Sequence, residues 1–166
     1  EVRSSRPAPR GADPESRAEP TAQIPIGSLP ALFYRRLEDF PVGAPPLVPD
    51  PRAVARWRAW LHGLGPGLKA GFSWRSGLRT TVRRRYMAEI EDLAPVLKVP
   101  GLTWINLQYD ECRADLAAAE ADLGIRIHRP MLDLRNDIDE VAALAAALGV
   151  VVSPGTAVAN IAAAVG

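Results

Sequence analysis

A chain of 166 residues with a formal net charge of +1 has no overall electrostatic attraction for nucleic acid or for an anionic lipid surface. Its 48% hydrophobic and 23% charged residues are typical of a globular protein, long enough for one domain and a tail. A single cysteine excludes an internal disulfide framework, and the longest apolar run, residues 141–152, is too short to span a bilayer. The chain opens without an apolar leader and without methionine, so we expect a cytoplasmic fragment of a longer protein.

Residues 1–23 are rich in proline, arginine, glutamate, alanine and serine, and they contain few large apolar side chains. Such a segment cannot bury enough surface to offset the entropy lost on ordering, so a disordered tail is predicted.

Residues 24–66 are predicted to be a linker with helices from an interdomain region. Ser28 is expected to cap a short helix that ends near residue 37, and four prolines extend the chain over residues 41–49. Asp50, followed by a proline, is a strong helix start, and apolar residues at three- and four-residue spacing predict one buried face after it.

Strands and helices alternate from residue 67 to residue 166. The predicted strands cover 68–74, 102–107, 125–128 and 150–153, and the predicted helices cover 87–97, 110–123, 137–148 and 156–165. This alternation predicts an α/β fold with a Rossmann-like parallel sheet and helices on both faces. Ligands of such sheets bind outside the carboxyl ends of the strands, so the loops after the strands are the places to look for a site.

The last predicted strand passes through the turn Ser153-Pro154-Gly155-Thr156 into a helix rich in small residues. Backbone N–H groups and the positive end of the helix dipole converge at such a turn, where they can bind a phosphate. Gly155 permits close approach of a ligand, Thr156 offers a hydroxyl, and Asn160 lies one turn further on the same face. The alternative is an ordinary strand-to-helix turn with a threonine N-cap.

The first predicted strand ends in Ser73-Trp74-Arg75-Ser76, which offers two hydroxyls and a guanidinium to a phosphate or a sugar. The alternative is a surface loop with a partly buried tryptophan. The arginine-rich run that follows includes Arg79 and Arg85, which are candidate phosphate contacts, although charge runs are more often solvated. It lacks the stacking aromatic residues of a nucleic-acid site.

Gln108 and Tyr109 follow the second predicted strand, where they can meet a base or a sugar. The alternative is that Tyr109 packs beneath the loop, and in either case Asp110 is expected to cap the next helix.

Four acidic residues near residue 137 suggest either metal ligands or an acid–base pair: Asp133, Asp137, Asp139 and Glu140. The helix dipole favours carboxylates at a helix N-terminus without any ligand, which is the simpler interpretation. The two histidines and the cysteine do not have zinc-site spacing, and no P-loop or catalytic-triad signature is present. No metal and no cofactor is therefore expected.

The chain resembles a known family over residues 24–166. It is similar to part of the glycosyltransferase-like region downstream of tetratricopeptide repeats in bacterial proteins. That region is related to ADP-heptose:lipopolysaccharide heptosyltransferases and, more distantly, to O-linked N-acetylglucosamine transferases. The segments that carry the resemblance are IPIGSLPALF (24–33), PDPRAVARWRAWL (49–61), LKAGFSWRSG (68–77), GLTWINLQYDEC (101–112) and DIDEVAALAAALGVVVSPGTAVANIAAAVG (137–166).

The resemblance implies the carboxyl-terminal, donor-binding half of a two-domain glycosyltransferase of the B type. A nucleoside diphosphate sugar would be the substrate, and a protein or glycan hydroxyl would be the acceptor. The donor would lie among residues 73–76, Gln108, the loop before Asp137 and residues 153–160. The catalytic base stays unassigned, because the resemblance places it in an amino-terminal acceptor domain that the full-length chain would carry together with the repeats.

Two positions depart from the family pattern. Gly155-Thr156 stands where relatives often have Asp-Thr, and Asn160 stands where they often have histidine. The departures remove a carboxylate and an imidazole from the expected diphosphate-binding site. The alternative to an active enzyme is therefore a catalytically inactive interaction or scaffold module. The Rossmann-like domain, residues 67–166, also stops before the next expected strand, and this truncated fragment alone is expected to be inactive.

Overall fold

The computed structural model describes residues 23–40, 43, 45–77 and 87–166. The predicted disordered tail, up to residue 22, lies outside the described residues, as do Arg79 and Arg85. The chain divides into two compact units, residues 1–43 and residues 44–166. In the part that the structure describes, no helix is both long enough and apolar enough to cross a membrane.

The described part of the first unit contains only short helical turns: η2 (Ile26–Ser28), α1 (Pro30–Phe33) and η3 (Leu37–Asp39). The predicted cap at Ser28 is wrong, because Leu29 is the N-cap of α1 and no side chain caps it. Ser28 instead ends η2 and donates its backbone N–H to the carbonyl of Pro25 at 2.9 Å. The continuous helix expected to residue 37 is therefore broken into turns.

The second unit is built around a four-stranded parallel sheet in the order β3-β2-β1-β4. Its strands are β1 (Leu68–Phe72), β2 (Leu102–Asn106), β3 (Ile127–His128) and β4 (Val150–Val152). Gly71 of β1 lies opposite Ile105 on one side and Val151 on the other. The predicted parallel sheet is thus confirmed, and β1 is an inner strand of it.

Helices connect the strands, and α2 (Pro51–His62) precedes β1. The Asp50 side chain accepts a hydrogen bond from the N–H of Arg52 at 2.9 Å, so the predicted cap is confirmed. The other helices of the sheet unit are η4 (Ile90–Leu93), α4 (Ala94–Leu97), α5 (Arg113–Leu123), α6 (Ile138–Ala145) and α7 (Ala157–Val165).

The helix expected over residues 87–97 is shorter than predicted. Residues 90–93 form a 3₁₀ turn, and the α-helical part has only four residues. Pro95 explains the difference, because proline has no N–H to donate and is tolerated in an α-helix only within the first turn. The α-helix therefore cannot begin a full turn earlier.

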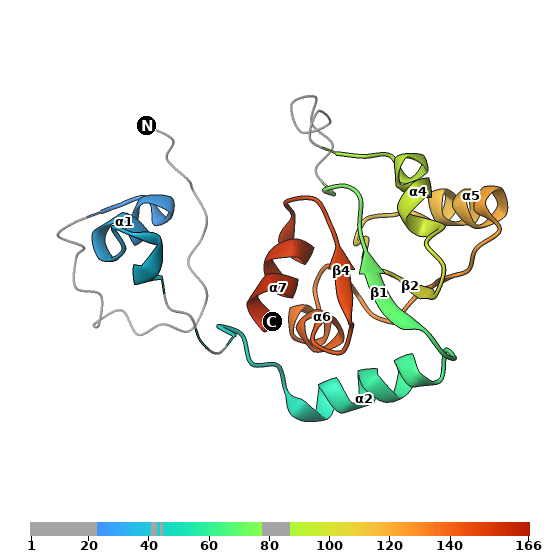
Figure 1. Ribbon diagram of the computed structural model, residues 1–166, viewed down its shortest axis with the longest axis horizontal. Coiled ribbons are helices and arrows are strands. Elements are labelled where there is room, and N and C mark those ends of the chain that lie inside the picture. Colours follow the sequence, from blue (N-terminus) through green and yellow to red (C-terminus); the bar gives the residue numbers. More distant parts are fainter. Residues whose placement is uncertain (1–22, 41–42, 44, 78–86) are drawn as a thin grey trace, which may run out of the picture. The chain divides into compact units, whose positions relative to one another are not determined.

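The helices cover both faces of the sheet, as Figure 1 shows. On one face, Phe72 and Trp104 meet edge to face with ring centroids 5.6 Å apart. Burial of apolar surface on both faces supplies the main driving force for this fold. The first face packs β1, β2 and β3 against Ile90, Leu97 and Leu116 of η4, α4 and α5. The second face packs Ile105 and Leu107 against Leu61, Leu144 and Val158 of α2, α6 and α7.

Glu120 joins α5 to the short strand β3. Its carboxylate accepts hydrogen bonds from the Ile127 N–H and from the Arg129 guanidinium, both at 2.8 Å. Burial alone raises the pKa of Glu120, but these two partners outweigh burial and hold the pKa below its ordinary value of 4.5.

We expect Glu120→Gln to lower the free energy of unfolding near neutral pH by about 0.2–1 kcal/mol, since glutamine keeps the acceptor but loses the charge. A carboxyl group with a depressed folded-state pKa stabilises the protein above its unfolded-state value. The difference between the two proteins should therefore shrink as the pH falls through the folded-state pKa of Glu120. Urea unfolding at neutral and acidic pH measures this difference, and one that grows on acidification would contradict the assignment.

Candidate functional site at the carboxyl ends of β1 and β4

The site lies where β1 and β4 end side by side. The chain leaves β1 toward the face of α4 and α5, whereas it leaves β4 into α7 on the opposite face. Adjacent parallel strands whose connections diverge in this way form the crevice in which open α/β sheets bind ligands. The Ser73 and Ser153 hydroxyl oxygens are 2.8 Å apart, and they join the two strand ends.

Thr156 occupies the N-cap position of α7 with an extended backbone, but its side chain does not cap the helix. Its hydroxyl lies 3.1 Å from the Ser153 hydroxyl oxygen. The predicted N-cap position is thus confirmed, whereas the side-chain contact that usually accompanies it is made to the turn instead. The first N–H groups of α7 therefore lack the side-chain acceptor that usually caps a helix, and a helix start of this kind can bind an anion.

A cavity of about 530 Å³ opens beside this helix start. Its volume falls in the range of ligand pockets. Gly155 is exposed, and a Cβ atom built on it would meet no atom of the described residues beyond its chain neighbours within 4 Å, so none of them fills the space above the turn. The described residues that line the cavity carry no formal charge on their side chains: Ser76, Met87, Tyr109, Pro154, Gly155, Thr156, Ala157 and Asn160.

Five of the predicted site residues meet at this cavity. Four of them line it, namely Ser76, Gly155, Thr156 and Asn160. Ser153 lies directly behind, with its hydroxyl also 2.9 Å from the carbonyl oxygen of Pro154. The turn predicted to bind an anion therefore lines a cavity between described residues, together with Ser76 of the segment that follows β1.

The Arg75 guanidinium is held by carboxylates instead of lining this cavity. Its Nε lies 2.9 Å from Asp110 and its Nη1 lies 2.6 Å from Asp115, with only 6% of the Arg75 side chain exposed. Burial lowers the pKa of Arg75, but the hydrogen bonds to the two aspartates outweigh burial and raise the pKa above its ordinary value. The predicted cap at Asp110 is wrong, because Cys112 is the N-cap of α5 and Asp110 pairs with Arg75.

The Gln108 side chain, which follows β2, forms hydrogen bonds to the backbone of the loop after β1. Its amide oxygen accepts hydrogen bonds from the N–H groups of Trp74 and Arg75, both at 3.1 Å. Its amide nitrogen donates to the carbonyl of Arg75 at 3.0 Å. Trp74 is buried, and its ring packs 5.7 Å from that of Phe72. Gln108, Trp74 and Arg75 thus position the loop that carries Ser76.

Two residues of the cavity wall have no strong signal in the sequence. Tyr109 was open to either a packing or a binding interpretation, and it lines the cavity with its hydroxyl accepting from the Gly77 N–H at 3.1 Å. Met87 also lines the cavity, and its sulfur accepts from the Ser76 N–H at 3.4 Å. The only signal for Tyr109 in the sequence is an aromatic residue shortly after the second strand.

A second cavity of about 530 Å³ lies at the carboxyl ends of β2 and β3, and residues of both signs line it, including Asp110, Arg113 and Arg129. Cys112 also lines it, and burial, with nearby carboxylates adding to the effect, raises the pKa of its thiol to about 11. The thiol is therefore protonated near neutral pH and is a poor nucleophile.

Two of the four acidic residues predicted near residue 137, Asp133 and Glu140, have hydrogen-bond partners. Asp133 accepts from the N–H groups of Arg135 and Asn136, and Glu140 accepts from Arg56 and from the Trp57 indole N–H at 2.8 Å. Among the described residues, no group of three or more histidine, cysteine or acidic side chains is placed to hold a metal ion.

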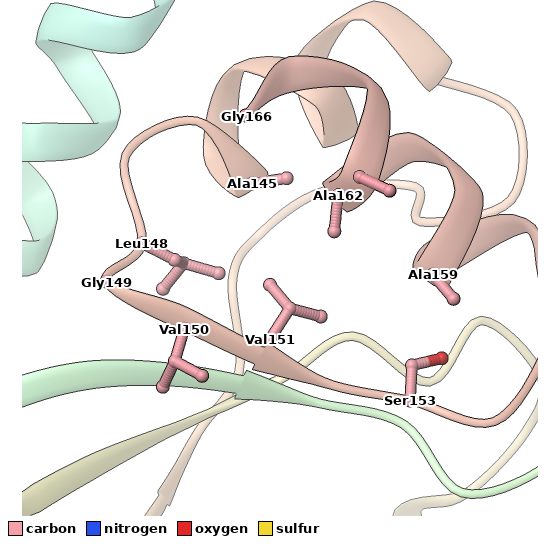
Figure 2. Close-up of a pocket in the computed structure, with 10 residues that line it drawn as sticks. Ala145, Leu148, Gly149, Val150, Val151, Ser153, Ala159, Ala162 and Gly166 are labelled. Atoms are coloured by element: carbon pink, nitrogen blue, oxygen red, sulfur yellow. The ribbon is translucent and has the colours of Figure 1, made fainter. Parts of the chain in front are cut away.

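A third cavity, of about 330 Å³, lies between α7 and β4, which is the outer strand at this end of the sheet. Figure 2 shows its apolar lining, with Ala162 of α7 pointing toward Val151 of β4. Ser153 contributes a side-chain hydroxyl to this lining, and that hydroxyl is hydrogen-bonded to the Ser73 hydroxyl. Apart from Ser153, the described residues that line this cavity have no polar side chain.

The described residues therefore define a parallel α/β domain with a Rossmann-like sheet and a hydroxyl-lined cavity at the junction of β1 and β4. Among curated proteins, the chain is similar to Protein FlbA of Caulobacter vibrioides (strain ATCC 19089 / CIP 103742 / CB 15), with 42% identity over 142 residues. The matched region covers 85% of this chain and 24% of FlbA, so the chain spans about a quarter of the length of this relative. No family model and no solved structure matches the chain.

Proposed function

We propose that this chain is the donor-binding part of a B-type glycosyltransferase that moves a sugar from a nucleoside diphosphate sugar to a protein or glycan hydroxyl. The observation that carries the proposal is the start of α7, where Thr156 is the N-cap without capping and a cavity opens beside it. Uncapped N–H groups and the helix dipole favour a bound phosphate. The resemblance to heptosyltransferases and O-linked N-acetylglucosamine transferases supports the same site.

In the proposed reaction, the bond between the anomeric carbon and the diphosphate oxygen breaks while the acceptor oxygen bonds to that carbon. The N–H groups of α7 and the Thr156 hydroxyl stabilise the negative charge that develops on the departing diphosphate. The acceptor proton passes to a base outside the described residues of this chain. The proposal has three further parts. The full-length protein carries an amino-terminal acceptor domain, it carries tetratricopeptide repeats, and it is a member of the glycosyltransferase-like family.

A second candidate is a catalytically inactive module that serves as an interaction scaffold. One specific observation favours it: the described lining of the cavity contains neither a carboxylate nor an imidazole. Gly155 and Asn160 stand where the similar enzymes often have aspartate and histidine. Such a module keeps the fold without turnover.

Thermal unfolding of the intact protein separates the two candidates. A nucleoside diphosphate that binds the native state raises the unfolding midpoint by mass action. We expect a rise with at least one of ADP, GDP and UDP, and no rise with any of them at millimolar concentration would favour the scaffold.

Thr156→Val is expected to weaken diphosphate binding by about 1–3 kcal/mol, because it removes a hydrogen bond to a charged group. Thr156→Ser keeps the hydroxyl and serves as the matched control, with affinity close to that of the parent. Isothermal titration calorimetry measures both variants. Equal affinity of the valine variant and the parent would remove Thr156 from the site.

A further inference from the structure

The cavity at the start of α7 has two chemically different parts. The turn and the helix contribute hydrogen-bonding groups through Thr156 and Asn160. Tyr109, three residues after β2, contributes an aromatic ring, and Met87 contributes a thioether. Inorganic phosphate can use only the first part. A ligand that combines a phosphate with a flat, weakly polar ring can use both.

Tyr109 is fixed in this wall from two directions. Its hydroxyl accepts a hydrogen bond from the Gly77 N–H at 3.1 Å and lies 3.5 Å from the Ser76 hydroxyl. The space beside Gly77 is filled by the ring, because a Cβ atom at residue 77 would lie 2.9 Å from Cε2 of Tyr109. The ring is half-buried, and it still lines the cavity. A ring held in this way can accept a ligand with little loss of side-chain entropy.

We infer that Tyr109 is a specificity-determining residue, whose ring contacts a nucleobase joined to the phosphates that the α7 turn binds. This inference rests on the proposed function, since it needs an anion at that turn. Tyr109 discriminates nucleoside diphosphates from free pyrophosphate, while Thr156 and the α7 N–H groups bind both. Stacking of a base on an aromatic side chain changes affinity by about tenfold or more.

Calorimetry on the intact protein tests the inference with ADP, GDP and UDP, each compared with inorganic pyrophosphate. In the parent protein, at least one nucleoside diphosphate should bind about tenfold more tightly than pyrophosphate. Tyr109→Leu should abolish this preference and leave pyrophosphate affinity unchanged. Tyr109→Phe keeps the ring and loses the hydroxyl contacts with Gly77 and Ser76, so it should keep the preference. Thermal unfolding confirms that each variant is folded.

The other outcomes are distinct. If pyrophosphate binds as tightly as every nucleoside diphosphate, and Thr156→Val weakens it, the role of Tyr109 is overturned while the anion site stands. If leucine and phenylalanine at residue 109 weaken all probes alike, Tyr109 only holds the Ser76–Gly77 turn, and the inference is also overturned. If no probe binds, the proposed function itself fails.

Discussion

Arg75→Leu is expected to lower the free energy of unfolding by about 3–5 kcal/mol, because it leaves the largely buried Asp110 carboxylate without its partner. The Arg75 side chain is 6% exposed and Asp110 is 17% exposed, so water cannot replace the guanidinium freely. One oxygen of Asp110, Oδ1, already lacks a hydrogen-bond partner among the described residues. Urea unfolding followed by circular dichroism measures the loss.

Two controls test the cause. Arg58 is exposed on α2, and Arg58→Leu should change stability by no more than about 0.5 kcal/mol. Replacing Arg75 and Asp110 together with apolar residues should cost less than replacing Arg75 alone, since no unpaired charge stays behind at residue 110. A loss below about 1 kcal/mol for Arg75→Leu would show that the ion pairs are solvated in solution.

Gln108→Leu is expected to destabilise the protein by about 2–6 kcal/mol, since two buried N–H groups lose their acceptor at about 1–3 kcal/mol each. These are the N–H groups of Trp74 and Arg75. Gln23, the other glutamine of the chain, is exposed, and Gln23→Leu is the matched control with a change within about 0.5 kcal/mol.

The same substitution separates positioning from binding at Gln108. If Gln108 only holds the loop after β1, the leucine variant loses stability, and any loss of ligand affinity follows from displacement of Ser76. Differential scanning calorimetry in the absence of ligand measures the first effect directly. Unchanged stability combined with lost affinity would make Gln108 a ligand contact instead.

Much of the sheet was predictable from the sequence. Apolar runs separated by helical patterns predicted four parallel strands with helices on both faces, and the structure has both. The order of the strands was not predictable, because periodicity does not say which strands are neighbours. The 3₁₀ turn at residues 90–93 was missed because the apolar spacing there suits an α-helix, while Pro95 restricts where one can begin.

The candidate site was predictable only where local geometry decides it. The turn at residues 153–156 follows from its own sequence, and the structure places it beside a cavity. The partners of Arg75 and Gln108 lie more than 30 residues away along the chain, and local sequence cannot identify such pairs. The prediction that Asp110 caps a helix was wrong for the same reason. Its carboxylate pairs with Arg75, which is distant in the sequence.

The contact between Ser73 and Ser153 joins residues that are 80 positions apart in the sequence. Contacting residues of β1 and β2 are only about 34 positions apart. Closing the longer loop costs more chain entropy, and contacts of large sequence separation form slowly. We therefore expect β1 to pair first with β2, and β4 to dock afterwards. During synthesis, the crevice between β1 and β4 would then form only after about the last tenth of this sequence has emerged from the ribosome.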